Sequence, residues 1–362
     1  MNDLSKGHGS HPGSIDYDKY PFIVFWEVTR ACKLACRHCR ASAIEEPSEN
    51  ELDLEEGKEL IDEISSCEQS PVLVFTGGDP LMRNDIFELI DYSVEKGLRT
   101  AFTPAPTSEV DKETIKRLKS AGVSRLALSL DGSCRETHDH IRGDGSYESI
   151  MKAAEISKEI GLPVQINTMV TKNTYKELED IVELVEELDA VMWSLFFLVH
   201  VGRGQALESV TSEEAEEILN FLYEESGKRD FQVKTTEACH YRRVVIQNSD
   251  MISEEKSIDD IGRSIGVNDG NGVVFVSRDG DIYPSGFLPL KEGNVREDSL
   301  IEVYRNSEVF KDLRDKSGLK GECGICEFRE ICGGSRARAY ATNGDYLAED
   351  PLCSYNPEEN TG

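Results

Sequence analysis

Short apolar runs rich in β-branched and aromatic residues alternate with longer amphipathic segments along the first two thirds of the chain. The apolar runs have the length of buried strands, and the segments between them carry apolar residues at helical spacing. Strands that are apolar on both faces and are each followed by a helix are typical of a parallel sheet covered by helices. The predicted strands lie at 21–29, 71–78, 99–106, 124–132, 164–170 and 190–199, and the predicted helices at 53–66, 84–97, 111–122, 147–161, 174–189 and 212–226.

Right-handed crossovers between these strands would curve the six strand–helix units into a partial barrel. Glycines at the ends of three predicted helices, Gly97, Gly122 and Gly161, support the boundaries. We therefore predict an α/β fold, with a partial (β/α)6 barrel over residues 21–227 and a flexible N-terminal tail over residues 1–20.

The pattern changes after residue 227. Residues 228–270 are polar and mixed, and "GVVFVSRDGDIYPSG" predicts a β-hairpin around Asp279 and Gly280. The end of the chain is rich in Gly, Arg and Cys. We predict a linker and hairpin over residues 228–285, followed by a small Cys-rich domain over residues 286–362.

The charge of the chain argues against one class of partner. Its 362 residues include 40 Lys and Arg against 69 Asp and Glu, and the acidic residues are spread over the predicted helices. Nucleic acid is therefore not an expected partner. No apolar run reaches the length of a membrane span and the N-terminus lacks a signal-peptide pattern, so we expect a cytoplasmic protein without a membrane partner. In that compartment, ten cysteines predict thiolate ligands or buried thiols before disulfides.

Three cysteines, Cys32, Cys36 and Cys39, follow the first predicted strand within "EVTRACKLACRHCR". Ligands of a parallel α/β sheet collect at the carboxyl ends of its strands, which is where this segment begins. Three thiolates can hold a four-iron, four-sulfur cluster and leave one iron without a protein ligand. A zinc ion is the alternative, but it would need a fourth ligand, and the adjacent His38 shares the same short loop.

A second group of cysteines lies near the C-terminus, with the spacing C-x2-C-x5-C and a distant fourth member. Four thiolates suit a fully ligated iron–sulfur cluster, and the same pattern also suits a structural zinc ion. The residues are Cys323, Cys326, Cys332 and Cys353.

The first cysteine motif and its position resemble those of the radical S-adenosylmethionine (radical SAM) enzymes. "GGDP" (77–80) ends the second strand, where the family has Gly-Gly-Glu-Pro; "SLDG" (129–132) ends the fourth, "QINT" (165–168) lies in the fifth, and "VGRG" (201–204) follows the sixth. Taken singly, these motifs are also ordinary turns and strand ends. The resemblance covers about residues 21–227 and implies a barrel of the radical SAM type. It also implies that S-adenosylmethionine is seated by Gly77, Gly78, Asp79, Ser129, Asn167 and Thr168.

The resemblance implies a specific chemistry. The open iron of the [4Fe-4S] cluster would bind S-adenosylmethionine, and an electron from an external reductant such as ferredoxin or flavodoxin would cleave it. The resulting 5′-deoxyadenosyl radical would abstract hydrogen from a substrate held away from water. A non-catalytic iron–sulfur scaffold is a further hypothesis, but it would not need three thiolates around an open iron.

The C-terminal region resembles the SPASM and twitch extensions of radical SAM enzymes, which carry auxiliary clusters. "YPSGFLPL", "GNVRE", "CEFREICGGSRARAY" and "GDYLAEDPLC" are similar to the branch that modifies tetrapyrroles in alternative haem and haem d1 synthesis. Ser285 and Ser335 stand where haem-forming members have cysteine. We therefore predict one auxiliary [4Fe-4S] cluster, held by the four C-terminal cysteines.

Two activities follow from these resemblances. The first is oxidative decarboxylation or side-chain removal on a tetrapyrrole. The second is maturation of a ribosomally made peptide, since SPASM extensions are common in such enzymes. The short segment before Phe22 contains no added peptide-recognition region, which favours the small-molecule substrate.

Several other residues have chemistry without a clear assignment. Cys67 is expected to be a packed thiol, and Cys134 is isolated. Cys239 precedes "HYRR" in a segment that could form the mouth for an anionic substrate, and we favour the alternative, a solvated loop. Arg336 and Arg338 could pair with substrate propionates or with acidic residues of the chain. The candidates for proton or hydrogen relay are His138, His140, His200 and Tyr241, although a lone histidine is more often structural.

Overall fold

The computed structural model describes residues 16–249 and 267–357, and these form one ten-stranded sheet with the order β10-β9-β8-β1-β2-β3-β4-β5-β6-β7. Neighbouring strands from β8 through β1 to β7 are parallel, and β9 and β10 are antiparallel additions. The strands are β1 (Ile23–Glu27), β2 (Val72–Thr76), β3 (Arg99–Phe102), β4 (Arg125–Ser129), β5 (Val164–Val170), β6 (Met192–Phe197), β7 (Gln232–Thr236), β8 (Val273–Val276), β9 (Asp281–Tyr283) and β10 (Gly293–Asn294).

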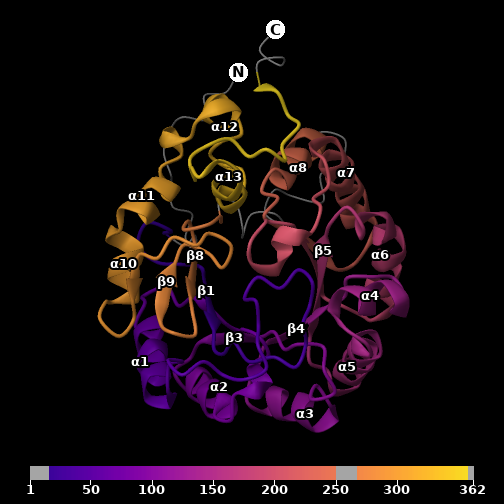
Figure 1. The fold of residues 1–362 in the computed structure, drawn as a ribbon, viewed down its shortest axis with the longest axis vertical. Coiled ribbons are helices and arrows are strands. Elements are labelled where there is room, and N and C mark those ends of the chain that lie inside the picture. Colours follow the sequence, from indigo (N-terminus) through magenta and orange to yellow (C-terminus); the bar gives the residue numbers. More distant parts are fainter. Residues whose placement is uncertain (1–15, 250–266, 358–362) are drawn as a thin grey trace.

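Helices surround the curved sheet. Figure 1 shows α1 to α7 around the outside, while α12 and α13 lie at the top of that view, between α11 on the left and α8 on the right. The helices are α1 (Leu54–Ser65), α2 (Ile86–Glu95), α3 (Lys112–Ser120), α4 (Arg135–Arg142), α5 (Ser146–Ile160), α6 (Leu178–Glu187), α7 (Ser212–Lys228), α8 (Tyr241–Ser249), α10 (Leu300–Asn306), α11 (Glu308–Arg314), α12 (Gly321–Ile325) and α13 (Arg336–Asn343).

The predicted α/β architecture is confirmed: six strand–helix units follow one another, and each observed strand lies within its predicted range. Several elements were not predicted: β7, α4, α8, and the short elements β10 and α10 to α13 of the C-terminal region. Two of them belong to the barrel, β7 and α4. The β7 sequence "QVKTT" is polar, and α4 ("RETHDHIR") is charged around its circumference, so neither shows a buried apolar pattern. The predicted hairpin forms as β8 and β9, and β8 pairs in parallel with β1, so it extends the sheet of the barrel.

The two faces of the central strands differ in chemistry. Residues that face the helices form the main apolar core, in which Trp26, Phe75 and Trp193 are fully buried. Most of the alternate positions of β4, β5 and β7, which face the inside of the barrel, are polar, for example Arg125 and Asn167, whereas Ala127 and Met169 are apolar. This alternation leaves a polar interior where a charged ligand could be accommodated.

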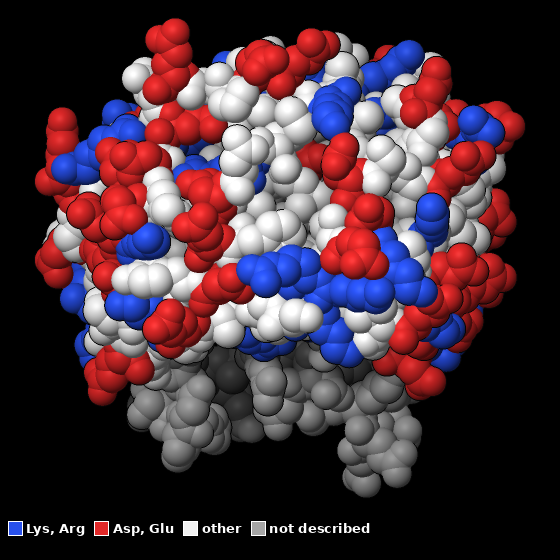
Figure 2. Space-filling view, turned by 90° about the horizontal axis from the view of Figure 1, so that it is seen from below, with Lys and Arg blue, Asp and Glu red and all other residues white. Residues whose placement is uncertain are grey.

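Acidic side chains are distributed over the surface. On the face shown in Figure 2, red acidic groups are scattered, and a smaller run of blue basic groups lies near the lower edge of the described part. Among the described helices, none combines the length and the apolar character that crossing a membrane would require.

Candidate active site

The loop after β1 brings three thiols together at the carboxyl end of the sheet. Cys32 and Cys36 are buried, Cys39 is partly buried, and all three are free thiols. Burial raises the pKa of the Cys32 thiol to about 11, and Asp79, Cys36 and Cys39 add smaller upward contributions because they lie close by. The Leu34 amide N–H donates to Cys32 Sγ (3.3 Å), and the Ala43 amide N–H donates to Cys39 Sγ (3.5 Å). Such amide–sulfur hydrogen bonds stabilise thiolates that ligate iron–sulfur clusters.

The "GGDP" segment after β2 packs directly against this loop. The Gly78 N–H donates to Thr29 O (2.8 Å), and the Asp79 N–H donates to Ala31 O (2.7 Å). A Cβ atom on Gly78 would lie 2.3 Å from Ala31 O, so a side chain at this position would push the two segments apart. Burial raises the pKa of Asp79 to about 6, and its carboxylate accepts hydrogen bonds from the Leu81 and Ala105 amides.

The other residues predicted to seat S-adenosylmethionine divide into two groups. Ser129 and Asn167 are register partners on the interior face, and the Gln165 side-chain amide donates to Asn167 Oδ1 (2.7 Å). Thr168 has the opposite orientation: its hydroxyl donates to Leu130 O (2.8 Å) and accepts from Trp193 Nε1 (2.9 Å). This orientation favours a supporting role for Thr168 at the end of β5 over a direct contact with a ligand.

The "VGRG" segment after β6 holds the cysteine loop, a contact that the sequence analysis did not predict. The Arg203 amide N–H donates to Cys39 O (3.0 Å), and its side chain donates to Cys36 O (2.9 Å) and to Ala43 O (3.0 Å). Gly202 has φ +54°, and a Cβ atom there would lie 2.3 Å from Arg40 O. The glycine therefore permits close approach of the two backbones.

Gly202→Ala is expected to lower the iron content of the reconstituted protein at the N-terminal cluster, because the new methyl group would displace the cysteine loop. We expect a loss of about 10–100-fold in cluster affinity, as for other supporting residues of metal sites. Iron analysis and electron paramagnetic resonance of the reduced protein would measure it. Gly97→Ala is the matched control, since Gly97 also has positive φ (+83°) but its Cβ would meet nothing within 4 Å. If Gly202→Ala and Gly97→Ala lose the same amount of iron, the cause is backbone strain and not the contact with the cysteine loop.

A buried network of Asp131, Arg142 and His38 supports the other side of the cysteine loop. Arg142 Nε donates to Asp131 Oδ2 (2.5 Å), and Arg142 Nη2 lies 3.2 Å from His38 Nε2. Burial lowers the pKa of His38 to about 4, so this imidazole is neutral at pH 7. The Cys36 thiol lies 3.6 Å from Arg142 O. Arg142 was missed because its helix, α4, has no apolar pattern.

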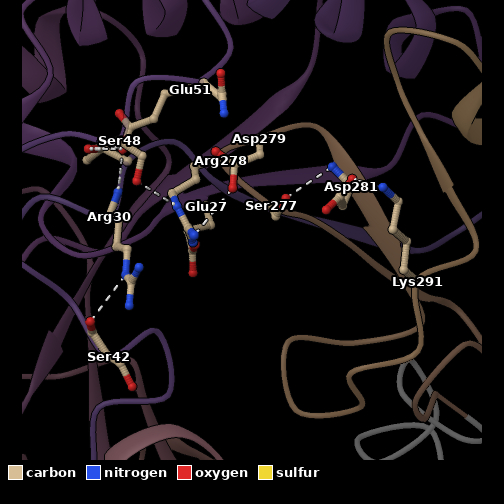
Figure 3. Close-up of polar contacts among 12 residues, drawn as sticks. Glu27, Arg30, Ser42, Ser48, Glu51, Ser277, Arg278, Asp279, Asp281 and Lys291 are labelled. Atoms are coloured by element: carbon tan, nitrogen blue, oxygen red, sulfur yellow. Dashed lines mark hydrogen bonds and ion pairs between the residues drawn. The ribbon is translucent and has the colours of Figure 1, made fainter.

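An ion-paired group anchors the loop to β1 and to the β8–β9 hairpin. The buried Glu27 carboxylate at the end of β1 pairs with Arg40 (2.6 Å) and with Arg278 (2.7 Å). Figure 3 shows Arg278 reaching Glu27, with Arg30 and Glu51 nearby. Since Arg40 directly follows Cys39, this pairing ties the end of the cysteine motif to the sheet.

The four C-terminal cysteines line one cavity, together with Asp350 and Tyr355. The Asp350 amide N–H donates to Cys323 Sγ (3.4 Å), and the Gly334 amide N–H donates to Cys332 Sγ (3.4 Å). The four residues are Cys323, Cys326, Cys332 and Cys353.

Ser285 and Ser335 have hydrogen-bonding roles away from the lining of this cavity. Ser285 Oγ accepts from the Phe287 and Leu288 amides, each at 3.2 Å. Ser335 caps α13 by accepting from the Arg338 amide (2.9 Å), and its hydroxyl donates to the carboxylate of Glu237. Both hydroxyls therefore stabilise local backbone and side-chain geometry.

The donors of both cysteine groups are thiols, which as thiolates can ligate iron–sulfur clusters or zinc. Within residues 16–249 and 267–357, no three Cys, His, Asp or Glu side chains converge closely enough to hold a single metal ion. A zinc ion would require its donors within about 2.3 Å of one point. A cluster is larger than one ion, and the amide–sulfur hydrogen bonds at both cysteine groups match its requirements.

Two arginines are structural. Arg336 is fully buried and donates to Tyr346 O and Ala348 O, while Arg338 pairs with Asp350 (3.1 Å). Of the two alternatives, pairing with an acidic residue of the chain is therefore observed for Arg338. Neither guanidinium is available to a propionate at the surface.

The interpretation of the segment around Cys239 as a solvated loop is wrong. Cys239, His240 and Arg243 are buried, because the chain turns beneath the C-terminal region and continues into α8. Arg243 pairs with Glu216 of α7. Cys67 is buried as predicted.

The relay candidates do not converge. His138 is buried and accepts from the Asp131 amide (3.1 Å), and Tyr241 is buried with its hydroxyl donating to Leu222 O (3.4 Å). His140 and His200 are exposed. These positions indicate structural roles for the two buried residues.

Residues 26–185 match the family model described as the Radical SAM superfamily. An AdoMet-dependent heme synthase from Methanosarcina barkeri is 40% identical over 341 residues, covering 93% of this chain and 97% of that protein. Another from Nitratidesulfovibrio vulgaris is 40% identical over 345 residues, covering 94% of each. A PqqA peptide cyclase from Bradyrhizobium diazoefficiens is 27% identical over 353 residues, covering 94% of this chain and 88% of that protein.

Among solved structures, Streptococcus suis SuiB bound to its precursor peptide SuiA superimposes with a TM-score of 0.74 at 17% identity, covering 93% of this chain and 76% of that one. This similarity concerns the fold.

Proposed function

This chain belongs to the radical SAM superfamily, and we propose that it acts on a tetrapyrrole side chain, by oxidative decarboxylation or side-chain removal in haem-type biosynthesis. The observation that carries the proposal is 40% identity to AdoMet-dependent heme synthases over 93–94% of the chain. The peptide-maturing relatives are more distant, at 27% identity, so peptide maturation is the less supported alternative.

We propose that Cys32, Cys36 and Cys39 hold the [4Fe-4S] cluster that superfamily members use with S-adenosylmethionine. When bound, this pair supplies one-electron cleavage to a 5′-deoxyadenosyl radical. The residues proposed to seat S-adenosylmethionine directly are Gly77, Gly78, Asp79, Ser129 and Asn167, with Thr168 supporting the strand end.

The other residues of the chain must position the substrate next to the S-adenosylmethionine site and exclude water from it. The cysteine loop is held by Arg203, Arg142 and Glu27, and the barrel interior would hold one substrate arm next to the S-adenosylmethionine site. A propionate arm that becomes a vinyl group loses one hydrogen atom, carbon dioxide and one further electron. An external carrier such as ferredoxin or flavodoxin would deliver the initiating electron, and we place the reaction in the cytoplasm, where such carriers act.

The test is an anaerobic assay of the reconstituted, reduced protein with S-adenosylmethionine and iron-coproporphyrin or didecarboxysirohaem. Liquid chromatography with mass spectrometry would follow 5′-deoxyadenosine and the tetrapyrrole together. We expect loss of carboxyl or acetate mass coupled to 5′-deoxyadenosine. Formation of 5′-deoxyadenosine with every tetrapyrrole unchanged would reject the substrate and turn attention to peptides.

We further propose that Cys323, Cys326, Cys332 and Cys353 hold one auxiliary [4Fe-4S] cluster, which accepts the surplus electron. The shared cavity and the amide–sulfur hydrogen bonds support this assignment.

Cys326→Ala is expected to remove about four iron ions per chain. It should retain cleavage of S-adenosylmethionine while losing most of the tetrapyrrole product, because the product electron would have no acceptor. Iron content and the ratio of product to 5′-deoxyadenosine would measure both effects. An unchanged iron content would contradict the assignment, and zinc in the purified protein would favour a structural metal.

A further inference from the structure

Positive side chains line the interior face of the barrel without a carboxylate partner. Leu126, Ile166 and Trp193 face the helices in the apolar core, so the alternate positions of β4 to β7 face inward. Two of these inward positions carry cations, Arg125 on β4 and Lys234 on β7. In a chain with a net charge of −29, interior cations that no acid neutralises require an explanation.

The register of the sheet places Lys234 in the layer proposed for S-adenosylmethionine. Lys234 pairs with Ser194, Ser194 pairs with Asn167, and Asn167 pairs with Ser129. The Lys234 backbone is therefore at the same level of the sheet as Ser129 and Asn167. Its strand, β7, is the last of the sheet on the side away from β8, β9 and β10.

Within the described residues, Lys234 forms no hydrogen bond or ion pair, and no carboxylate contributes to its electrostatics. Burial, followed by the positive charges of Arg242 and Arg125, lowers the pKa of Lys234 to about 8. Both arginines are thus close enough to act on the Lys234 ammonium group, and the Cys239 thiol makes a smaller contribution in the opposite direction. Lys234 is partly exposed, so its ammonium group is accessible from the barrel interior, and an anionic ligand that enters there would supply the missing negative charge.

The two neighbouring arginines are held in place by uncharged groups. Arg125 Nη1 contacts Gln165 Oε1 (3.3 Å) and Met192 Sδ (3.4 Å). Arg242 donates to Ile331 O (3.0 Å) and to Val267 O. Carbonyl, amide and thioether groups fix these guanidinium groups but leave their positive charge unneutralised. Ile331 directly precedes Cys332, so Arg242 lies between the barrel and the C-terminal cysteine cavity.

We propose that Lys234, flanked by Arg125 and Arg242, binds a carboxylate of the substrate inside the barrel, between the two cysteine sites. This inference rests on the proposed tetrapyrrole function, whose substrates carry several carboxylates. A carboxylate at this point would satisfy the unpaired ammonium group. It would also position an arm of the macrocycle beside the S-adenosylmethionine layer. S-adenosylmethionine has a carboxylate as well, so the test must separate the two sources.

The experiment titrates reconstituted holoprotein with iron-coproporphyrin and, separately, with its tetramethyl ester, which has no free carboxylate, and follows porphyrin absorbance. Lys234→Met should bind the acid about 10- to 100-fold more weakly, the range for loss of one charged hydrogen bond. Binding of the ester should be unchanged. Lys234→Arg should recover most of the affinity, which separates loss of charge from misfolding. Lys116→Met is the matched control, since Lys116 lies on α3 with 52% side-chain exposure.

A second arm measures 5′-deoxyadenosine formed by the same variants without tetrapyrrole. An unchanged rate in Lys234→Met assigns the site to the substrate. A loss of this uncoupled cleavage with full porphyrin affinity would assign Lys234 to S-adenosylmethionine and overturn the inference. Equal porphyrin affinity in Lys234→Met and the parent protein would also overturn it, while leaving the tetrapyrrole function intact. If the parent protein binds neither porphyrin, the proposed function fails and this inference fails with it.

Discussion

Cys36→Ala is expected to abolish formation of 5′-deoxyadenosine. Cys36 is a buried thiol in the loop held by Arg203 and Arg142, and we propose it as one of three ligands of the N-terminal cluster. Loss of a supporting residue typically lowers metal affinity about 10–100-fold, so loss of a ligand should reduce activity to below about 1% of the parent protein. Anaerobic turnover with S-adenosylmethionine, together with iron and sulfide analysis, would measure this effect.

The control for this experiment is Cys134→Ala, which removes an exposed thiol outside both cysteine groups. Cys36→Ala should also retain about four iron ions per chain at the C-terminal site. Full S-adenosylmethionine cleavage in Cys36→Ala would refute the assignment of the N-terminal cysteines. It would restore the hypothesis of a non-catalytic iron–sulfur scaffold for this motif.

Asp131→Asn should destabilise the protein and loosen the cysteine loop. The Asp131 side chain is 1% exposed, and it pairs with the largely buried Arg142. Burial acts to raise the pKa of Asp131, but Arg142, His38 and His138 more than offset it, so the pKa is lowered. Removing the charge leaves a buried guanidinium without its counterion, which typically lowers stability by about 3–5 kcal/mol. We expect a lower melting temperature and a lower iron content after reconstitution.

The matched control is Asp91→Asn on α2, whose carboxylate pairs with Arg117 at the surface. Such an exposed pair contributes only about 0–1 kcal/mol to stability, so the melting temperature of Asp91→Asn should barely change.

The direction of the Asp131 pKa shift also predicts how the stability of the parent protein depends on pH. Because the folded-state pKa of Asp131 is lowered, its contribution is complete above the unfolded pKa and is lost as the pH falls through the folded value. A parent protein and an Asp131→Asn variant with equal melting temperatures at pH 7 would contradict this role.

Most of the barrel could be predicted because its strands are recognisable from short segments of the sequence. β1, β2 and β6 are apolar runs, and the segments that follow them have amphipathic helical patterns. These patterns do not depend on contacts with distant parts of the chain. β7 and α4 escaped prediction for the opposite reason. Lys234 in β7 faces a polar interior, and Arg142 in α4 pairs with a carboxylate from another element, so neither element shows an apolar stripe.

The errors around the C-terminal region have the same physical origin. The segment around Cys239 was expected to be a solvated loop because connecting loops lie at the surface and charged residues such as Arg243 are usually exposed. In the folded chain, Arg243 pairs with Glu216, which allows its burial. Whether a charge is exposed depends on a partner distant in sequence, and composition does not reveal that partner.

The sequence by itself determined the order of the strand–helix units, both cysteine groups and the motifs at the strand ends, because these depend on spacing within short segments. Only the tertiary structure decided what supports them. Glu27 meets Arg278 across 251 positions, Arg203 reaches back to Cys36, and Lys234 joins the layer of Asn167 through strand pairing. These relations arise when the sheet closes and brings distant segments together, so they are not encoded in any local pattern of residues.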